Sequence, residues 1–321
     1  MLMEIDRLEN QALVNRLVET HQVSNQTLDL YHSDIDWYVN HHFDCQNPEN
    51  FAACQQVQKG YKVSLKYENN QFYKGIIPCE HLVYQQNEQK FLRRFLLTDF
   101  DPFQQEQVFY KTNEQNLKFF TLNYDDSKSQ EIIQTRINSK EEFLLKQQVV
   151  AYYHDVLANK KRYGIYLWGS LGLGKTTLFR FLAIDAAKNH QKTIAFYSVS
   201  NLVNLLKGSF SNNAENSKKI LEQLQIADFL FLDDIGGEPA SEWLRDDVLF
   251  TVLNYRMTHE KTTFFTSNFS IDRLRRNYQA KIGKTYPGSK EDNELKNERF
   301  IERINVLAKE IELIGTNHRI K

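Results

Sequence analysis

The segment GSLGLGKTT at residues 169–177 has the residue types and the spacing of a phosphate-binding loop. It satisfies the pattern G-x-x-x-x-G-K-[ST], whose backbone and following helix N-terminus present N–H groups to phosphates. In such loops the lysine reaches the β- and γ-phosphates, and the threonine hydroxyl binds Mg²⁺. The segment follows an apolar run typical of a strand and opens a run typical of a helix, as this chemistry requires. We therefore predict an ATP–Mg²⁺ site at Gly169, Ser170, Leu171, Gly172, Leu173, Gly174, Lys175, Thr176 and Thr177.

A second chemical element is the run FLFLDD at residues 229–234, an apolar strand pattern that ends in two carboxylates. Following a phosphate-binding loop, Asp233 is predicted to support Mg²⁺ and Asp234 to polarise the attacking water. Asp234 is one methylene shorter than the glutamate that many ATPases use here, which favours slow hydrolysis. The run TTFFTSN ends in Asn268, whose amide we expect between the loop and Asp233, in contact with the γ-phosphate or the water. Together these elements look like those of an AAA+ ATPase, with Asn268 as its sensor 1.

The elements that must position these residues follow from the hydrophobic pattern. From residue 163 onward, strand and helix patterns alternate, which predicts a parallel sheet with helices on both faces. We expect an α/β fold with a P-loop AAA+ core. Strands are predicted at 163–168, 193–199, 229–234 and 262–268, and helices at 177–189, 201–207, 241–257 and from residue 297.

The N-terminal part has a different pattern. An amphipathic helix around Leu13 and Leu17 and a second helix over 28–39 precede two alternating segments, 62–68 and 71–77, which flank Asn69-Asn70 as a hairpin. Residues 98–138 lack a clear period and predict a connector with one short helix. Ser139 and Glu142 form a capping box that opens a helix through about residue 157. The expected domains are a small α+β domain over 1–97, a linker over 98–138 and the ATPase domain over 139–321.

Composition limits the classes of function. No apolar run approaches the ~18–20 residues of a membrane span, and MLMEIDRLENQ lacks the pattern of a signal peptide, so we expect a cytoplasmic protein. The net charge of -1 provides no global basic field, so nucleic-acid binding would need a local patch. The three cysteines lie between residues 45 and 79, and their odd number favours a metal site or free thiols over a disulfide framework.

Three blocks carry a family resemblance: FLFLDDIGGEPASEWLRDDVLFTVLNYRM, TTFFTSNFS and NERFIERINVLAKEIELIGTNHR. They resemble the bacterial primosomal DnaC-type AAA+ helicase loaders, and the likeness covers about residues 163–319. It implies an ATP-dependent protein that binds the replicative DnaB-type helicase and single-stranded DNA. It also implies delivery of the helicase onto the strand in primosome assembly and replication initiation.

The resemblance also implies roles for single residues. Arg303 matches an arginine finger that enters a neighbouring subunit's site, with Arg299 as the rival, which implies self-association on the partner. On single-sequence grounds alone, salt bridges to Glu298 and Glu302 are the favoured interpretation of both arginines. Arg319 matches a sensor-2-like arginine. Lys207 and Phe210 resemble the stretch that faces single-stranded DNA, by phosphate contact and base stacking, although Phe210 could equally pack in the core.

The family's N-terminal domain binds the helicase and carries a zinc ion. Cys45, Cys54, Cys79 and His81 offer such a Cys₃His set, because a hairpin would bring the two pairs together. The spacing departs from the family pattern, and His41 or His42 could supply the fourth ligand instead. Three buried, inert cysteines are the alternative.

Two other functions remain open at this point. An IstB-like transposition helper would share the loop, the two aspartates and Asn268, but would act on duplex DNA with a transposase. A nucleotide-binding switch with negligible hydrolysis would also fit Asp234 in place of glutamate.

Overall fold

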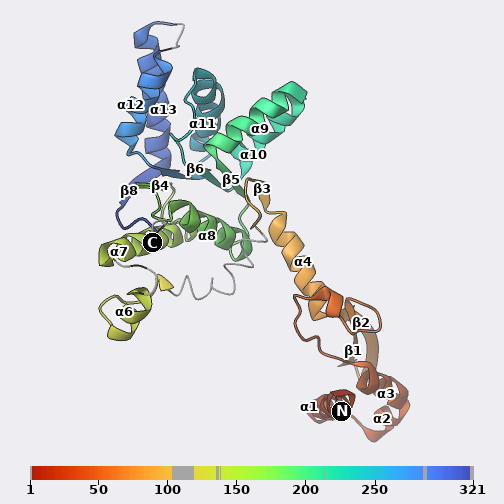
Figure 1. Cartoon of the computed structure of the whole chain (residues 1–321). Helices are drawn as coiled ribbons and strands as arrows, with labels where there is room; N and C mark the ends of the chain where they lie inside the picture. Colours follow the sequence, from red (N-terminus) through yellow and green to blue (C-terminus); the bar gives the residue numbers. More distant parts are fainter. Residues whose placement is uncertain are drawn as a thin grey trace. The chain divides into compact units, whose positions relative to one another are not determined.

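The computed structural model describes residues 2–102, 119–134, 137, 139–212, 214–284 and 288–318. It divides the chain into two compact units, Met1–Lys90 and Phe91–Lys321 (Figure 1). We describe each unit by itself. Among the described residues, none of the helices has the length and apolar character needed to cross a bilayer.

The N-terminal unit packs three helices against a two-stranded hairpin. Its core is formed by Val14, Val23, Ile35, Val39 and Phe72. The predicted helix over 28–39 is two helices that meet at Tyr31, whose φ of −107° and ψ of 13° leave the helical region. The elements are α1 (Leu2–His21), α2 (Asn25–Leu30), α3 (His32–His41), the short 3₁₀ helix η1 (Phe51–Ala53), β1 (Tyr61–Glu68), β2 (Gln71–Pro78) and α4 (Glu80–Leu92), which crosses into the second unit.

The hairpin forms as its sequence predicts. Strands β1 and β2 pair antiparallel from Tyr61 opposite Pro78 to Glu68 opposite Gln71. The turn residues Asn69 and Asn70 both have positive φ, 51° and 61°. Asparagine tolerates this conformation better than most residues, and two such residues make the tight turn that suits the twist of a hairpin.

The C-terminal unit is built on a six-stranded sheet with the order β3-β5-β6-β7-β4-β8, in which every described pair is parallel. The strand that ends at Asn268 lies between the strand of the phosphate-binding loop and the strand of Asp233, as predicted. The strands are β3 (Phe95–Thr98), β4 (Gly164–Gly169), β5 (Ile194–Ser198), β6 (Phe229–Asp233), β7 (Thr262–Ser267) and β8 (Ala308–Leu313).

Both faces of this sheet are covered by helices (Figure 1). Side chains alternate across the strands, so Ile165 and Leu167 pack with α7 and α8, whereas Tyr166 packs with the helices of the opposite face. This arrangement confirms the predicted α/β core. The helices are α6 (Ser127–Gln134), α7 (Lys140–Leu157), α8 (Lys175–Lys188), α9 (Val199–Asn212), α10 (Ala214–Ile226), α11 (Phe250–Thr258), α12 (Ile271–Ile282) and α13 (Lys290–Leu307), with a π-helical segment η2 (Trp243–Leu249) before α11.

The division between the two units falls after Lys90, whereas the sequence analysis expects the first domain to extend to residue 97. Strand β3 begins before residue 97, yet it pairs with β5 and extends the sheet of the C-terminal unit. Part of the expected linker over 98–138 is also folded. Phe119, Ile133 and Ile137 form a buried cluster with Phe143 of α7, whereas residues 103–118, 135, 136 and 138 lie outside the described part of the chain.

The predicted capping box at the start of α7 is half formed. The Ser139 hydroxyl accepts a hydrogen bond from the Glu142 backbone N–H at 3.4 Å, as predicted. The Glu142 carboxylate does not return to Ser139. It accepts hydrogen bonds from Lys146 at 2.6 Å and from the backbone N–H of Thr316 at 3.2 Å, and it pairs with His318 at 2.5 Å.

Candidate functional site

The phosphate-binding loop connects β4 to the N-terminus of α8. Gly174 stands directly before the helix with φ of 78°, in the left-handed region that favours glycine. Gly172 has φ of 81°, and a Cβ atom there would lie 1.8 Å from the Asn317 side-chain oxygen. The backbone of Gly172 also accepts a hydrogen bond from the His318 N–H at 3.0 Å. Asn317 and His318, the last described residues of the chain, therefore pack against the loop at Gly172.

Lys175 points back into the loop and across to the neighbouring strand. Its amino group donates to the carbonyls of Gly169 and Ser170, both at 2.8 Å, and to Asn268 Oδ1 at 3.0 Å. The side-chain amide of Asn268 in turn donates to Asp234 Oδ1 at 2.9 Å. Asn268 thus links Lys175 to the Asp234 carboxylate. It does so from the end of β7, which lies between β4 and β6 in the sheet.

Thr176 and Asp233 are in direct contact. The Thr176 hydroxyl lies 2.9 Å from Asp233 Oδ1 and 3.1 Å from Asp233 Oδ2. Thr266 of β7 donates to the same carboxylate at 2.5 Å, and its hydroxyl accepts from the Asp234 backbone N–H at 2.8 Å. A hydroxyl beside a carboxylate is the oxygen-ligand pair that holds Mg²⁺ beside nucleotide phosphates.

The two aspartates differ in environment. Burial raises the pKa of the Asp233 carboxyl above its ordinary value, although the Thr266 and Thr176 hydroxyls and the charge of Arg180 act in the opposite direction. Asp234 adopts φ of 54°, an uncommon left-handed conformation that Asp and Asn tolerate better than other residues. This conformation belongs to the turn at the end of β6, where the Gly237 N–H donates to the Asp234 carbonyl at 3.0 Å.

These residues line one cavity of about 530 Å³ at the carboxyl ends of the strands. Besides residues of the predicted loop, the two aspartates and Asn268, the cavity includes four residues that the sequence analysis missed: Arg180, Ser198, Thr266 and His318. Arg180 lies one helical turn after Thr176, so its spacing on α8 could have identified it. His318 is more than a hundred residues from the loop in sequence, and no local pattern connects them.

The structure places the remaining predicted residues away from this cavity or does not describe them. Arg299 and Arg303 lie on α13 with their guanidinium groups 4.9 and 5.4 Å from the Phe250 ring centroid. Arg303 also donates to Asn254 at 3.1 Å and pairs with Glu302 at 2.8 Å. Arg319 lies outside the described residues.

The predicted DNA-facing residues belong to α9, which starts beside Ser198 of the cavity. Lys207 is exposed, whereas the neighbouring Leu206 is fully buried, so the lysine points to solvent. The side chain of Phe210 is not among those that the structure describes.

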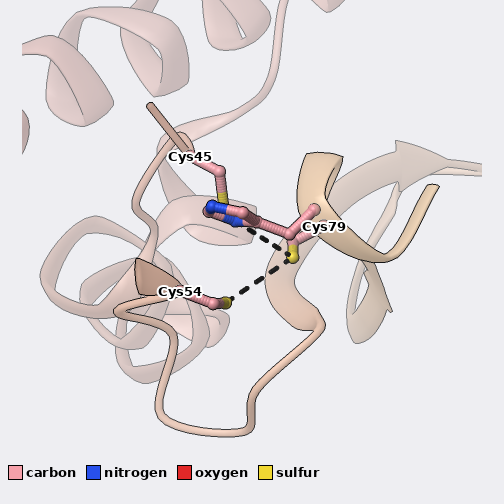
Figure 2. A group of neighbouring side chains, drawn as sticks. Cys45, Cys54 and Cys79 are labelled. Atoms are coloured by element: carbon pink, nitrogen blue, oxygen red, sulfur yellow. Dashed lines mark hydrogen bonds between the residues drawn. The ribbon is translucent and has the colours of Figure 1, made fainter. Parts of the chain in front are cut away.

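In the N-terminal unit, Cys45, Cys54, Cys79 and His81 come together, and their ligand atoms all lie within 4.8 Å of one another. Figure 2 shows the three cysteines converging from separate segments. Cys79 Sγ lies 3.9 Å from Cys54 Sγ and 4.0 Å from His81 Nδ1. A tetrahedral zinc ion with Zn–S bonds of about 2.3 Å separates its sulfurs by about 3.8 Å, so the spacing fits.

The environment of this cluster also suits a metal. Cys79 and His81 are 0% and 1% exposed, and His81 Nε2 is buried with no hydrogen-bond partner among the described residues. Burial acts to raise the pKa of the Cys54 thiol, but hydrogen bonds from the Gly60 and Gln56 N–H groups and with Cys79 and Cys45 together outweigh it and lower that pKa, favouring a thiolate. The two other candidate ligands are not part of this cluster. The His41 ring forms a hydrogen bond with the Trp37 carbonyl, and the His42 ring forms one with the Val63 carbonyl.

Comparisons with known proteins agree with the predicted resemblance. Residues 143–282 match the family of IstB-like ATP binding proteins. The chain is 34% identical over 186 residues to the replicative helicase loader DnaI of Bacillus subtilis (strain 168), which covers 58% of this chain and 57% of DnaI. It is 27% identical over 132 residues to the uncharacterized protein YqaM of the same strain, with 39% of this chain and 41% of YqaM covered. A crystal structure of DnaI matches at 32% identity with a TM-score of 0.46, covering 55% of this chain and 87% of that one.

The resemblance to the helicase loaders is thereby confirmed. The chain spans less than two thirds of the length of the curated relatives that it matches. The IstB-like match lies in the ATP-binding part, which a transposition helper and a helicase loader would share. The identity to DnaI favours the resemblance to the loaders.

Proposed function

Because this chain resembles DnaI, we propose that it is an ATP-dependent loader of a replicative DnaB-type helicase onto single-stranded DNA in primosome assembly and replication initiation. The observation that carries the proposal is the contact series Lys175–Asn268–Asp234 in a chain that is 34% identical to a replicative helicase loader. Such a series could report which nucleotide is bound, because its members would face the γ-phosphate of a bound ATP. A loader needs that signal to time the transfer of its cargo.

Nucleotide binding replaces contacts that the protein makes with itself. The Lys175 amino group exchanges the carbonyls of Gly169 and Ser170 for phosphate oxygens. Thr176 and Asp233 would hold Mg²⁺, which when bound would supply positive charge beside the phosphates. Asp234 orients the attacking water and accepts hydrogen bonds from it. The short aspartate side chain, already bonded to Asn268, favours slow intrinsic hydrolysis, and the nucleotide then acts mainly as a timing signal.

We further propose that the N-terminal unit binds the helicase. It exposes apolar side chains on one groove of about 190 Å³, where Val57 is 89% and Ile76 57% exposed beside Trp37 and Tyr61. Exposed apolar side chains that share one groove mark interaction sites more often than chance. A zinc ion at Cys45, Cys54, Cys79 and His81 would fix the loop that carries Val57, since this residue follows Cys54 by three positions.

The remaining expectations belong to the same proposal. Arg303 would act across a contact between copies assembled on the helicase, and Lys207 with Phe210 would contact single-stranded DNA along α9. As a replication factor of the bacterial type, the protein would act in the cytoplasm. Comparing binding to duplex and to single-stranded DNA separates this loader from a transposition helper.

The loader proposal is tested with the full chain in a helicase-loading assay on single-stranded DNA. We expect Lys175→Ala to abolish ATP-dependent loading while the helicase still co-purifies with the variant. Lys218→Ala, an exposed lysine on α10, serves as the matched control and should load normally. Val57→Asp/Ile76→Asp should show the opposite pattern, with ATP binding retained and the helicase lost. Failure of the wild-type chain to retain a replicative helicase would contradict the loader function, and loading by Lys175→Ala would contradict the role of ATP.

A further inference from the structure

A second large cavity lies at the amino ends of the strands, whereas the nucleotide site lies at their carboxyl ends. We call it the amino-edge groove, because it is formed where β4, β5, β6 and β7 begin. Its volume is about 510 Å³. The residues that line it are Val156, Asn159, Lys161, Arg162, Lys192, Asp228, Phe229, His259, Glu260, Lys261 and Thr262.

The groove carries an excess of positive charge. Four of its side chains are cationic, Lys161, Arg162, Lys192 and Lys261, and two are anionic, Asp228 and Glu260. Asp228 is committed to the fold, since it accepts hydrogen bonds from the backbone N–H and the hydroxyl of Thr193 at 2.9 and 2.8 Å. These bonds hold the starts of β5 and β6 together. Lys261 Nζ lies 3.5 Å from Asp228 Oδ1 and donates to the Ile226 carbonyl at 3.0 Å, so the fold holds this cation at the groove.

The outer cations are available to a ligand. Arg162 pairs with Glu260 at 2.7 Å, but the two side chains are 72% and 67% exposed. Exposed ion pairs are screened by solvent and contribute little to stability, so a phosphate can replace the glutamate at little cost. Lys161 is exposed. Tyr163 is not among the residues that line the groove, but it directly follows the lining residue Arg162 and is 53% exposed.

The cations lie in a row across the sheet. Lys192 comes two residues before β5, Lys261 directly before β7, and Arg162 two residues before β4. In the sheet these strands follow the order β5-β6-β7-β4. At about 4.8 Å per strand spacing, the row extends over about 14 Å, which is long enough for successive phosphates of one strand.

From this arrangement we propose that the amino-edge groove binds the sugar–phosphate backbone of a single-stranded nucleic acid, with Tyr163 stacking on a base. A row of cations beside an exposed aromatic ring is the composition of single-strand binding sites. An acidic peptide would use the same cations but has no need of an aromatic platform. The site is separate from α9 and from the nucleotide cavity, so it adds a second nucleic-acid contact to the proposed loader.

The experiment measures binding of the full chain to a fluorescent oligothymidylate by anisotropy over a series of salt concentrations. Lys161→Glu/Arg162→Glu should weaken binding about tenfold or more at low salt. Its log–log salt slope should fall by roughly 0.7 for each phosphate that the variant no longer neutralises. Tyr163→Ala should weaken binding about tenfold with the salt slope retained. The matched control is Lys284→Glu/Lys290→Glu, which reverses two exposed lysines elsewhere on the C-terminal unit and should bind less than about threefold more weakly.

Several results would overturn the inference. One is a Lys161→Glu/Arg162→Glu variant with wild-type affinity and slope, and another is a control whose affinity falls as far as that of this variant. Binding that poly-glutamate competes as well as oligothymidylate, with no effect of Tyr163→Ala, would assign the groove to an acidic protein instead. Binding of a fluorescent ATP analogue by each variant checks the fold and separates this result from a failure of the loader function, which Lys175→Ala addresses.

Discussion

The side-chain amide of Asn268 joins the amino group of Lys175 to the carboxylate of Asp234, with its oxygen 3.0 Å from the first and its nitrogen 2.9 Å from the second. The three residues come from the loop after β4, from the end of β7 and from the end of β6. A single amide therefore contacts both the group that would bind the γ-phosphate and the group that would orient the water.

Asn268→Ala should separate nucleotide binding from hydrolysis. The variant keeps the loop and Mg²⁺ ligands, so its affinity for ATP should change less than about threefold. Hydrolysis should fall about 100-fold, because the variant lacks an orienting hydrogen bond to Asp234 and to the water. Single-turnover hydrolysis with DNA and helicase present measures this effect. Equal rates for the variant and the wild type would exclude Asn268 from the reaction, and a wild-type rate equal to that of buffer would identify a switch without hydrolysis.

Asp233→Asn should stabilise the fold while it removes Mg²⁺-dependent nucleotide binding. A carboxyl whose folded-state pKa is raised costs stability at neutral pH, and this cost disappears as the pH falls from that pKa toward the ordinary value of 3.8. The asparagine carries no such cost, and its oxygen can still accept from the Thr176 and Thr266 hydroxyls. A gain of about 1 kcal/mol corresponds to about 2–4 °C in Tm.

Thermal unfolding of both proteins without nucleotide, from pH 7 down to about pH 4, checks this expectation. The advantage of the variant should be largest at pH 7 and shrink as the pH approaches the ordinary value of 3.8. A variant that is less stable at pH 7 would show that the charged form of Asp233 is required by the fold itself.

Zinc removal should affect the N-terminal unit alone. We expect one zinc ion per chain by elemental analysis, and a strong chelator should make residues before about 90 sensitive to protease. Binding of an ATP analogue should be retained, because the nucleotide cavity lies in the other unit. His81→Ala should lower the zinc content, whereas His41→Ala, an exposed histidine outside the cluster, should leave it unchanged. Absence of zinc together with an unchanged protease pattern would identify three buried, inert cysteines.

Arg303→Ala should reduce ATP hydrolysis only where several copies assemble. Asn254 and Glu302 hold the Arg303 guanidinium over the Phe250 ring, so little side-chain entropy is lost when it meets a phosphate. ATP affinity of the single chain should not change. The hydrolysis rate of the helicase-bound assembly should fall about 1,000-fold. Arg299→Ala is the matched comparison, and a larger loss with that variant would transfer the role to Arg299.

Much of the nucleotide site could be predicted without coordinates. The loop pattern, the apolar strand before Asp233-Asp234 and the strand before Asn268 are local signals, because a parallel sheet brings all its carboxyl strand ends to one edge. The Asn-Asn turn and most helices follow from local patterns in the same way. By contrast, the edge strands β3 and β8 were not predicted. β3 has only four residues, and β8 follows α13 directly at Ala308, so no turn signal separates it from the helix.

Only the tertiary structure decided the partners of residues far apart in sequence. The sequence alone determined that Glu142 belongs to the start of a helix. Its carboxylate, however, forms hydrogen bonds with Lys146 and with His318, whose backbone contacts the phosphate-binding loop. It likewise offered three candidate histidines for the cysteines, and the fold selected His81 because β2 ends at Pro78, directly before Cys79 and the first turn of α4. Such contacts depend on how helices and strands pack. The spacing of residues along the sequence does not indicate which distant side chains the packing brings together. For the same reason the row of cations at the amino-edge groove becomes visible only once β5, β7 and β4 lie in one sheet.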